Sequence, residues 1–424
     1  MKLFAVAGNP ILSSCSPLIW NYSFKKKKID AHYFRISADT AYDIIEMVKG
    51  IGLSGCNVTS PFKEDILDHI DKVEGDAAKI RAVNCIAAIG KKLIGYNTDV
   101  DGFYSALILN GFNPQDKKVV VVGAGGAAKA VIYALMKNGA YDVVIANRTY
   151  EKAKALSEIF NCRICSIDKI EKETKDADLL VSCVSTLDRV IKKDAIYKKL
   201  TVMDAKYNGV STLLKDAEFA GCKIIDGKEW LICQAAFFFK DFFNELPVDQ
   251  MKEALKKGHS KDLKDKKSIS LIGFMGTGKS SLGKALAEKL QYQFVDVDAQ
   301  IEKKEKMSIS EIFAKRGEAY FRQVETDIIT SIDHSLPTVV SCGGGAVIEQ
   351  KNVEALRFNS KVFWLWNTLE EIKKRITSKG RPLFAEADEI FHKRTLLYAK
   401  ACDICINNKE EKNTLKQILK ELAL

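Results

Sequence analysis

Residues 118–149 hold the pattern that most restricts how this chain folds. A run of β-branched residues, "KVVVV", ends in the glycine turn "GAGGAA", and an apolar-periodic segment follows to Asn138, just before Gly139. A second apolar run, "DVVIAN", ends at Asn147. This order predicts a strand, a helix and a parallel strand, the repeating unit of doubly wound α/β sheets.

The chain has 424 residues, which predicts two or three domains rather than one. We expect an α/β fold throughout: a Rossmann-type dinucleotide domain over 113–225 and a separate α/β substrate domain over 1–112, completed by the helical segment 226–255. The charged stretch 256–267 predicts a linker. The strand-like "SISLIGF" then opens a further α/β domain over 268–424, with a parallel sheet flanked by helices.

Composition indicates an ordinary soluble globular protein, with 47% hydrophobic and 28% charged residues. The net charge of +10 comes from scattered lysines, which favours anionic ligands in general but not a nucleic-acid partner, because no concentrated basic and aromatic patch is present. No apolar run is long enough to cross a membrane, and the amino terminus does not read as an export signal. These features predict a cytoplasmic protein without a membrane partner. They do not decide whether the chain forms a homo-oligomer.

Eleven cysteines, an odd number, fit a reducing compartment better than a disulfide framework. Two C-x-x-C spacings occur, at Cys162/Cys165 and Cys402/Cys405. They fall in different expected domains, and "CDICIN" has the pattern of an alternating strand, so we interpret them as buried or incidental cysteines rather than a zinc site.

The glycine turn after the first strand predicts a dinucleotide site. Glycines allow a tight turn and a close approach of the backbone to a pyrophosphate, at the start of a helix whose first N–H groups are unpaired. The second strand ends in "NRT", where Arg148 stands in place of the acid that binds a ribose hydroxyl, so NADP is favoured over NAD. The candidate cofactor residues are Gly123, Ala124, Gly125, Gly126, Ala127, Asn147, Arg148 and Thr149.

Two polar loops in the first domain, "GCNVTSPFK" and "GYNTDVDGF", have the composition of binding loops. Lys63 and Asp99 could form an ion-paired acid/base couple that exchanges a proton with an alcohol or ketone oxygen. Spacing alone leaves the alternative of ordinary surface charges open.

A second nucleotide loop, "GFMGTGKS", fits the P-loop pattern between a strand and a helix-like segment. Its backbone would cradle phosphates, Lys279 would neutralise them, and Ser280 would bind Mg²⁺, which implies phosphoryl transfer. The candidate nucleotide residues are Gly276, Thr277, Gly278, Lys279, Ser280 and Ser281.

The residues after this loop indicate the phosphate acceptor. In "FVDVDAQIE" we expect Asp296 and Asp298 on the same side of a strand, one near the metal and one near a hydroxyl. Arg322 and Glu325 lie about one helical turn apart. Several arginines together with an aspartate predict an acceptor with a carboxylate and a hydroxyl; the arginines are Arg322, Arg381 and Arg394.

Residues 1 to about 250 resemble shikimate dehydrogenase, through "GNPILSSCSP", "GCNVTSPFK", "AVNC", "GYNTDVDGF", "GAGGAA", "NRT" and "CQAAFFF" in that order. The resemblance implies that Lys63 and Asp99 are catalytic and that NADP(H) is the cofactor. It implies that the substrate is held by Ser14, Ser16, Thr59, Asn84, Tyr207 and Gln234.

The sequence departs from this family at a few places. Ser13 stands where histidine is usual, Ser182 and Val184 lie in a segment that normally reads Asn-Ala-Thr, Gly209 replaces a proline, and Glu229 replaces a glycine. Three of these four changes fall where the family contacts or shapes the nicotinamide end. Glu229 is expected to narrow the cofactor cleft or to place a negative charge near it.

Residues 269 to about 420 resemble shikimate kinase, through "GFMGTGKSSLGKALA", "FVDVDAQIE", "EAYFRQVE", "CGGGAV", "GRPLF" and "RTLLY". The resemblance implies ATP and Mg²⁺ as cofactors, with Asp296 near the metal and Arg381 on a lid that reaches the phosphates. It places Asp298 on the substrate hydroxyl, and Arg322, Gly344 and Arg394 on its carboxylate. Leu396 replaces a family proline.

Together these resemblances predict a bifunctional enzyme of aromatic amino acid biosynthesis, which reduces 3-dehydroshikimate with NADPH and then phosphorylates shikimate with ATP. One alternative is a catalytically impaired dehydrogenase-like sensor fused to an active kinase. Another, confined to the first part, is a dehydrogenase that prefers quinate.

Overall fold

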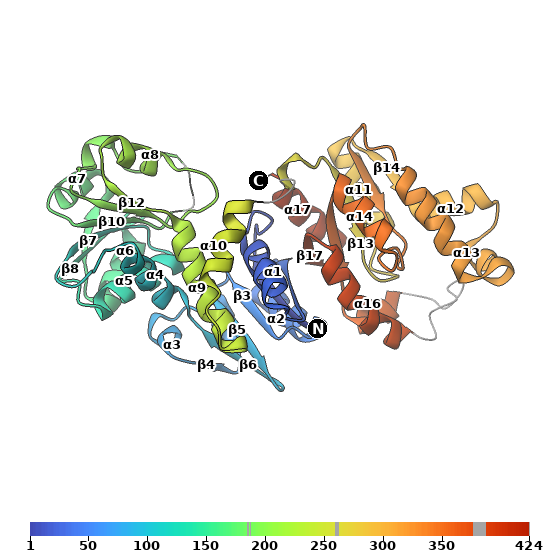
Figure 1. Cartoon of the computed structure of the whole chain (residues 1–424), viewed down its shortest axis with the longest axis horizontal. Helices are drawn as coiled ribbons and strands as arrows, with labels where there is room; N and C mark the ends of the chain where they lie inside the picture. Colours follow the sequence, from blue (N-terminus) through green and yellow to red (C-terminus); the bar gives the residue numbers. More distant parts are fainter. Residues whose placement is uncertain (185, 187, 259–262, 376–386, 424) are drawn as a thin grey trace. The chain divides into compact units, whose positions relative to one another are not determined.

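The computed structural model describes residues 1–424 except 185, 187, 259–262, 376–386 and 424 (Figure 1). The chain divides into two compact units. Unit 1 joins Met1–Asn57 to Lys257–Leu424, and unit 2 is Val58–Lys256. The first 57 residues are therefore grouped with the P-loop part of the chain.

Unit 2 contains a six-stranded sheet in the order β12-β11-β10-β7-β8-β9. Every neighbouring pair is parallel, which requires crossovers between strands, and helices lie in most of these connections. The strands are β7 (Lys118–Val122), β8 (Asp142–Asn147), β9 (Arg163–Ser166), β10 (Leu179–Ser182), β11 (Thr201–Asp204) and β12 (Lys223–Ile225). The helices are α5 (Gly126–Lys137), α6 (Tyr150–Phe160), α7 (Ile170–Thr174) and α8 (Thr212–Phe219), with short 3-10 turns at Ile167–Lys169 and Lys193–Ala195.

The predicted strand–helix–strand unit is confirmed. Helix α5 ends at Lys137, and Gly139 just beyond it has a φ of 81°, a conformation that suits glycine at a helix C-terminus. Strand β7 is buried along its whole length, as expected for a central strand of a parallel sheet.

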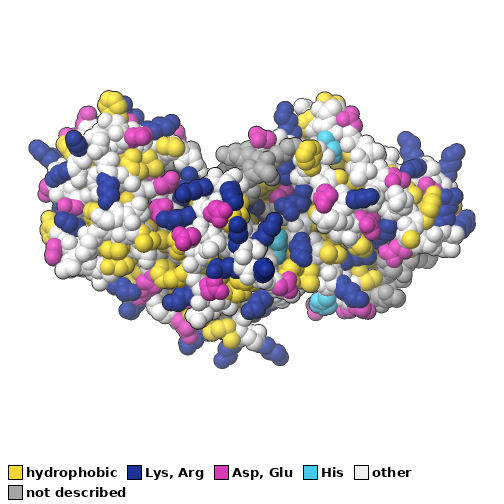
Figure 2. All heavy atoms as spheres, in the orientation of Figure 1, with side chains coloured by type: hydrophobic (Ala, Val, Ile, Leu, Met, Phe, Trp, Pro, Cys, Tyr) yellow, Lys and Arg dark blue, Asp and Glu magenta, His cyan; other side chains and the backbone are white. Residues whose placement is uncertain are grey.

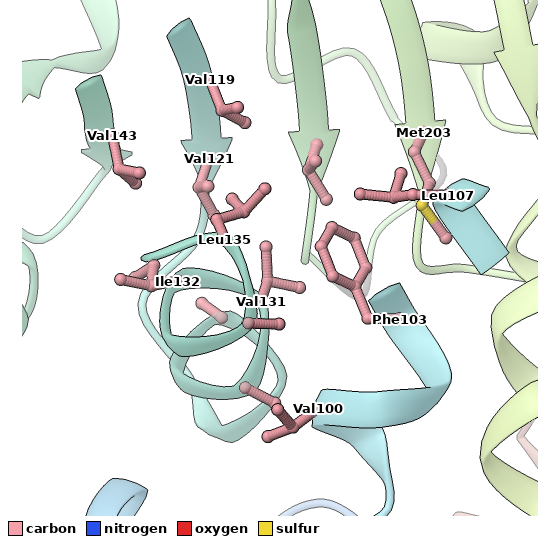
Figure 3. Packing of buried hydrophobic residues seen from close by; sticks show 14 of the residues in the cluster. Val100, Phe103, Leu107, Val119, Val121, Val131, Ile132, Leu135, Val143 and Met203 are labelled. Atoms are coloured by element: carbon pink, nitrogen blue, oxygen red, sulfur yellow. The ribbon is translucent and has the colours of Figure 1, made fainter. Parts of the chain in front are cut away.

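One hydrophobic core of unit 2 joins α5 to α4 (Asp99–Leu109) beneath β7 (Figure 3). Val100 and Phe103 of α4 meet Val131 of α5, while Val121 of β7 closes the layer above them. The long helix α9 (Gly227–Phe243) packs so closely on α4 that a Cβ on Gly102 would lie 2.7 Å from the Gln234 backbone. This helix, which begins the segment 226–255, therefore packs against the end of the first 112 residues.

The other elements of unit 2 precede and follow this sheet. An antiparallel hairpin joins β5 to β6, and β4 pairs with β6 in parallel. These elements are β4 (Lys72–Val73), β5 (Cys85–Ile89), β6 (Lys92–Tyr96), α3 (Asp76–Ile80), α10 (Val248–Lys257) and a 3-10 turn at Asp65–His69.

Unit 1 has a sheet whose strands follow the order β14-β15-β13-β16-β17-β2-β1-β3. The strands are β1 (Lys2–Gly8), β2 (Ala31–Ser37), β3 (Gly55–Val58, at the division of the units), β13 (Ser268–Ile272), β14 (Gln293–Asp296), β15 (Thr338–Ser341), β16 (Ser360–Trp366) and β17 (Ile404–Asn407). The helices are α1 (Ser16–Lys27), α2 (Ala41–Ile51), α11 (Lys279–Leu290), α12 (Val297–Glu305), α13 (Ile309–Ser331), α14 (Gln350–Asn359), α15 (Leu369–Arg375), α16 (Ala387–Ala401) and α17 (Glu411–Leu422), with a 3-10 turn at Leu263–Asp265.

The sheet of unit 1 is continuous between the two ends of the chain. Strand β17 pairs in parallel with β2, with Cys405 opposite Ile36 and Ile406 opposite Ser37. This pairing also corrects one expectation: "CDICIN" does form a strand, but β17 is a central strand buried on both faces and does not alternate.

The charged side chains are scattered over the surface seen in Figure 2, as the sequence indicated. On the face seen in Figure 2, lysine and arginine side chains are spread over both units among acidic and apolar ones. Lys25, Lys26 and Lys27 form the last turn of α1. All eleven cysteines are free thiols, and no helix in the described part of the chain is long and apolar enough to span a bilayer.

Candidate functional site

Lys63 and Asp99 form a close ion pair in unit 2. The Lys63 Nζ lies 2.5 Å from the Asp99 Oδ2, and the two side chains are only 15% and 9% exposed. The predicted pairing is confirmed, and burial sets it apart from an ordinary surface pair because water screens it less. A shielded ammonium beside a carboxylate is an arrangement suited to proton exchange with a bound oxygen.

The backbone around Asp99 is held by three side chains, of which only Asn84 was singled out from the sequence. Asn97 accepts a hydrogen bond from the Asp99 N–H at 2.9 Å, and Trp230 of α9 donates its indole N–H to the Asp99 carbonyl at 3.0 Å. Asn84 accepts from the Thr98 N–H at 2.8 Å and donates to the Thr98 hydroxyl at 3.2 Å. The first turn of α4 is thereby fixed from several sides.

The first glycine turn lies beside this pair. Gly123 has a φ of 116°, and a Cβ there would lie 3.2 Å from the Cys183 carbonyl oxygen, so the turn requires glycine. Gly125 precedes α5 without a side-chain cap, which leaves the helix N-terminus for an anion. A Cβ on Gly126 would be 3.4 Å from the Lys63 side chain, so the dinucleotide turn and the ion pair adjoin each other.

The "NRT" segment stands next to the turn at the end of β8. The Gly123 N–H donates to the Ala146 carbonyl at 2.9 Å, which ties the turn to the strand that leads into Asn147. Arg148 is exposed, and Thr149 precedes α6 without a side-chain cap. A cation and a second helix N-terminus therefore lie close to the glycine turn, where a 2′-phosphate would need them.

The other predicted substrate residues belong to both units. In unit 2, Thr59, Tyr207 and Gln234 are partly buried, and Gln234 donates to the Leu231 carbonyl at 2.8 Å. In unit 1, Ser14 and Ser16 are buried, with their hydroxyl oxygens 3.3 Å apart.

The structure shows the contacts, backbone conformation or burial of each residue that departs from the family pattern. Glu229 forms an ion pair with Lys252 at 2.9 Å, so its charge is compensated within unit 2. Gly209 has a φ of 94°, which proline cannot adopt, so the backbone here differs from that of a chain with proline. Ser182 is buried at the end of β10, Val184 is partly buried, and Ser13 is exposed.

The P-loop of unit 1 links β13 to α11. Gly276 and Gly278 have φ values of 78° and 81°, which point the loop backbone inward at low cost only for glycine. Lys279 is buried and donates to the Gly273 and Phe274 carbonyls at 2.9 and 2.8 Å. A buried ammonium at a helix N-terminus is a strong site for phosphate.

The loop is also anchored from outside. Asn408, just after β17, donates to the Thr277 carbonyl at 2.6 Å, and the Thr277 hydroxyl donates to the Phe274 carbonyl at 2.8 Å. Ser281 donates to the Gly278 carbonyl at 3.1 Å. Asn408 escaped prediction because it lies about 130 residues away in sequence, with nothing local to mark it.

The strand prediction for the two aspartates was wrong. Strand β14 ends at Asp296, whose carboxylate accepts from the Ala299 N–H at 3.1 Å and so caps α12. Asp298 therefore lies in the first turn of that helix. Ser280 is 3.3 Å from Ser341 at the end of β15, which adds a hydroxyl that the sequence did not indicate.

Asp298, Arg322 and Arg394 line one pocket of about 500 Å³. Arg322 is buried and donates to Glu325 at 2.7 Å and to Glu318 at 3.0 Å. Burial raises the pKa of the Asp298 carboxyl, against the opposing effect of the nearby Lys279 charge. The pocket thus combines cations with a carboxylate of perturbed pKa, a combination common at functional sites.

Three consecutive glycines give this pocket its space. A Cβ on Gly343 would lie 2.7 Å from both Asp298 Oδ1 and Glu325 Oε1, and one on Gly345 would lie 2.3 Å from the Arg322 guanidinium. The Gly344 carbonyl accepts from Arg394 at 3.2 Å and from the Tyr398 hydroxyl. The residues at positions 343 and 345 therefore have to be small.

One arginine of the predicted set remains to be placed, and one arginine outside that set lies close to the P-loop. Arg381 lies outside the described residues. Arg375 donates to the Asn408 and Lys409 carbonyls at 3.0 and 2.6 Å, close to the residue that anchors the P-loop. Leu396 lies within the uninterrupted helix α16, where proline would disturb the hydrogen bonds.

Three protein-family models match the chain. Residues 6–86 match the shikimate dehydrogenase substrate binding domain, and residues 107–207 match the shikimate / quinate 5-dehydrogenase family. Residues 275–423 match shikimate kinase. The second match includes the glycine turn that begins at Gly123, and the third begins inside the P-loop.

Curated relatives match the dehydrogenase part over nearly their full length. The NADP(+) shikimate dehydrogenase of Caldanaerobacter subterraneus subsp. tengcongensis is 36% identical over 268 residues, which cover 58% of this chain and 95% of the relative. The Pyrococcus abyssi enzyme of the same name is 37% identical over 246 residues, which cover 57% of this chain and 91% of the relative.

Solved structures agree in fold. A shikimate dehydrogenase from Thermus thermophilus in complex with NADP(H) and shikimate has a TM-score of 0.55 at 29% identity, covering 61% of this chain and 99% of the other. A quinate dehydrogenase from Corynebacterium glutamicum in complex with NAD has a TM-score of 0.56 at 26% identity, covering 61% and 99%. The chain therefore belongs to the shikimate dehydrogenase family and carries a shikimate kinase domain after the dehydrogenase part.

Proposed function

We propose that this chain catalyses two successive steps of aromatic amino acid biosynthesis: NADPH-dependent reduction of 3-dehydroshikimate, followed by ATP-dependent phosphorylation of shikimate. The observation that carries the proposal is that one chain holds both the buried Lys63–Asp99 pair beside a dinucleotide turn and a P-loop joined to a pocket lined by Arg322 and Arg394. Each arrangement suits one of the two reactions, and neither suits both.

The dehydrogenase part has a cradle that fits NADP(H). The turn from Gly123 to Ala127 would hold the pyrophosphate, and Asn147, Arg148 and Thr149 the adenosine end with its 2′-phosphate. Bound NADPH supplies a hydride to the ring ketone. Lys63 donates a proton to the oxygen that becomes the hydroxyl, while Asp99 keeps the Lys63 side chain oriented.

Hydroxyl and amide side chains would recognise the substrate of this part. They donate to a carboxylate or share hydrogen bonds with ring hydroxyls, which matches a small polyhydroxylated acid. We assign this role to Ser14, Ser16, Thr59, Asn84, Tyr207 and Gln234.

The kinase part fits ATP with Mg²⁺ and an acidic alcohol. Arg322, Arg394 and the Gly344 backbone would hold the shikimate carboxylate, because guanidinium groups match that planar anion. Asp298 would accept a hydrogen bond from the hydroxyl that attacks, at a distance from the carboxylate set by the pocket. This positioning is the main contribution a kinase makes to the reaction.

The nucleotide side of the kinase part uses the P-loop. Gly276, Thr277, Gly278 and Ser281 would surround the phosphates, and Lys279 would neutralise their charge. Ser280 and Asp296 would contribute to the Mg²⁺ site, and Arg381 would reach the phosphates. Mg²⁺ accepts such a small number of protein oxygens because it keeps water and phosphate oxygens as its other ligands.

We further propose that the domains follow the sequence boundaries, 1–112 with 226–255, 113–225 and 268–424, and that the chain works in the cytoplasm, where its eleven thiols stay reduced. A preference for quinate in place of shikimate is the second candidate, supported by the similarity to a quinate dehydrogenase. Faster NADP-linked oxidation of quinate than of shikimate would favour it.

Two single variants test whether each reaction has its own catalytic site. Lys63→Ala removes the proton donor, so NADP-linked shikimate oxidation should fall about 10²–10⁴-fold while ATP-dependent phosphorylation stays near normal. Lys279→Ala should do the reverse. If either variant, folded as judged by circular dichroism, lost both activities, two independent catalytic sites would be ruled out.

A further inference from the structure

The loop between β1 and α1, residues 9–15, contains Ser14 and ends just before Ser16, the two serines assigned to the substrate. Within it the Ser14 N–H donates to the Ile11 carbonyl at 2.9 Å, and the Ser14 and Ser16 hydroxyl oxygens lie 3.3 Å apart. The positions of these hydroxyls therefore depend on the backbone between Ile11 and Ser14.

Glu421 of the kinase part binds that backbone directly. One of its carboxylate oxygens accepts from the Ile11 N–H at 2.9 Å and from the Leu12 N–H at 2.8 Å, and the other accepts from Ile11 at 3.1 Å. The side chain is fully buried. A buried carboxylate is stable only where donors surround it, so these bonds are strong and specific to this loop geometry.

Arg35 of β2 fixes the other end of the loop. Its Nε and Nη2 donate to the Ser14 carbonyl at 3.1 and 2.6 Å, while its Nη1 donates to the Asp403 carbonyl at 3.1 Å. The Asp403 carboxylate accepts from the Val362 N–H of β16 at 2.9 Å. A chain of buried hydrogen bonds thus runs from a kinase strand to Ser14.

Other contacts between the kinase part and the first 57 residues lie away from the serine loop and are less buried. Lys409 pairs with Asp43 at 3.0 Å and with Glu46 at 2.9 Å, but Lys409 is 39% exposed and both partners lie on α2. This pair joins the segments without touching the serine loop. Removing it therefore tests the contact between the two segments in general, without disturbing the hydrogen bonds that hold the loop.

We propose that Glu421 and Arg35 are positioning residues for the dehydrogenase reaction, through which the kinase part holds Ser14 and Ser16 in place for the substrate carboxylate. The inference rests on the proposed function of the two serines. It extends that function, because the dehydrogenase site then depends on residues of the kinase part that touch neither substrate nor cofactor.

Steady-state kinetics on full-length variants test this proposal. Glu421→Leu leaves two loop N–H groups without their acceptor, so the KM for shikimate in NADP-linked oxidation should rise about tenfold or more. Glu421→Gln keeps an acceptor oxygen and should have a smaller effect. The KM for NADP⁺ and the kinase KM for ATP should change less than about twofold, and the control Lys409→Ala should match the wild type.

A folded Glu421→Leu variant with a wild-type KM for shikimate would overturn the proposal, as would an equal rise in the variant Lys409→Ala. If Glu421→Leu does not fold, Glu421→Gln and Arg35→Lys decide by the same comparison of KM values. Wild-type protein without NADP-linked shikimate oxidation would instead refute the proposed function itself, so the two failures are distinguishable.

Discussion

Replacing Gly345 by alanine would test the carboxylate site of the kinase part with one methyl group. The ideal Cβ lies 2.3 Å from Arg322 Nη2 and 2.4 Å from its Cζ and Nη1. Gly345 is not among the residues with positive φ, so alanine would bring no backbone strain. The guanidinium would have to move by about 1 Å to reach an ordinary contact distance.

That movement should be costly for substrate binding. Arg322 is held by Glu325 at 2.7 Å and by Glu318 at 3.0 Å, so it cannot retreat without loosening these bonds. A misplacement of about 1 Å costs about 10²-fold in rate, which corresponds to about 2.7 kcal/mol. Overpacking should also lower the free energy of unfolding by about 1–3 kcal/mol.

The assay measures shikimate phosphorylation through the ADP that it releases. We expect kcat/KM for shikimate to fall about 10²-fold, with little change in the KM for ATP. Dehydrogenase activity of the same sample serves as the internal control and should stay at the wild-type level. A folded variant with wild-type kcat/KM for shikimate would refute the role given to Arg322.

Two further predictions concern the cofactor and the pH. Arg148→Leu should raise the KM for NADP⁺ about 10- to 100-fold and leave NAD-linked oxidation unchanged, as measured with both cofactors; equal effects on the two would contradict a 2′-phosphate site. Because burial raises the pKa of Asp298, the kinase kcat/KM should fall as the pH drops through this raised pKa, at a higher pH than an exposed aspartate would give. A pH profile of phosphorylation at saturating ATP that stays flat down to the usual aspartate range would contradict that assignment.

The nucleotide loops could be predicted from the sequence because their chemistry is local. A glycine turn or a P-loop needs particular residues at fixed spacing between a strand and a helix, and both lie where the pattern indicated. The Lys63–Asp99 contact was inferred from two loops far apart in sequence, and the structure brings the pair to 2.5 Å.

Features that depend on tertiary packing escaped prediction. Asp298 belongs to a helix rather than a strand because Asp296 caps α12, a choice between strand and helix that a few residues cannot decide. Trp230, Asn408 and Glu421 act through contacts with distant backbone groups, which leave no local signal. The pairing of β17 with β2 is likewise a meeting of two distant segments.

One coupled assay tests the central claim most directly. Purified full-length protein is given 3-dehydroshikimate, NADPH, ATP and Mg²⁺, and NADPH loss and ADP formation are followed together. The account predicts NADPH loss without ATP, ADP formation only after 3-dehydroshikimate has been reduced, and final amounts of the two that are equal. ADP formation that does not depend on NADPH, or NADPH loss without any subsequent ADP formation, would contradict two successive reactions on one ring.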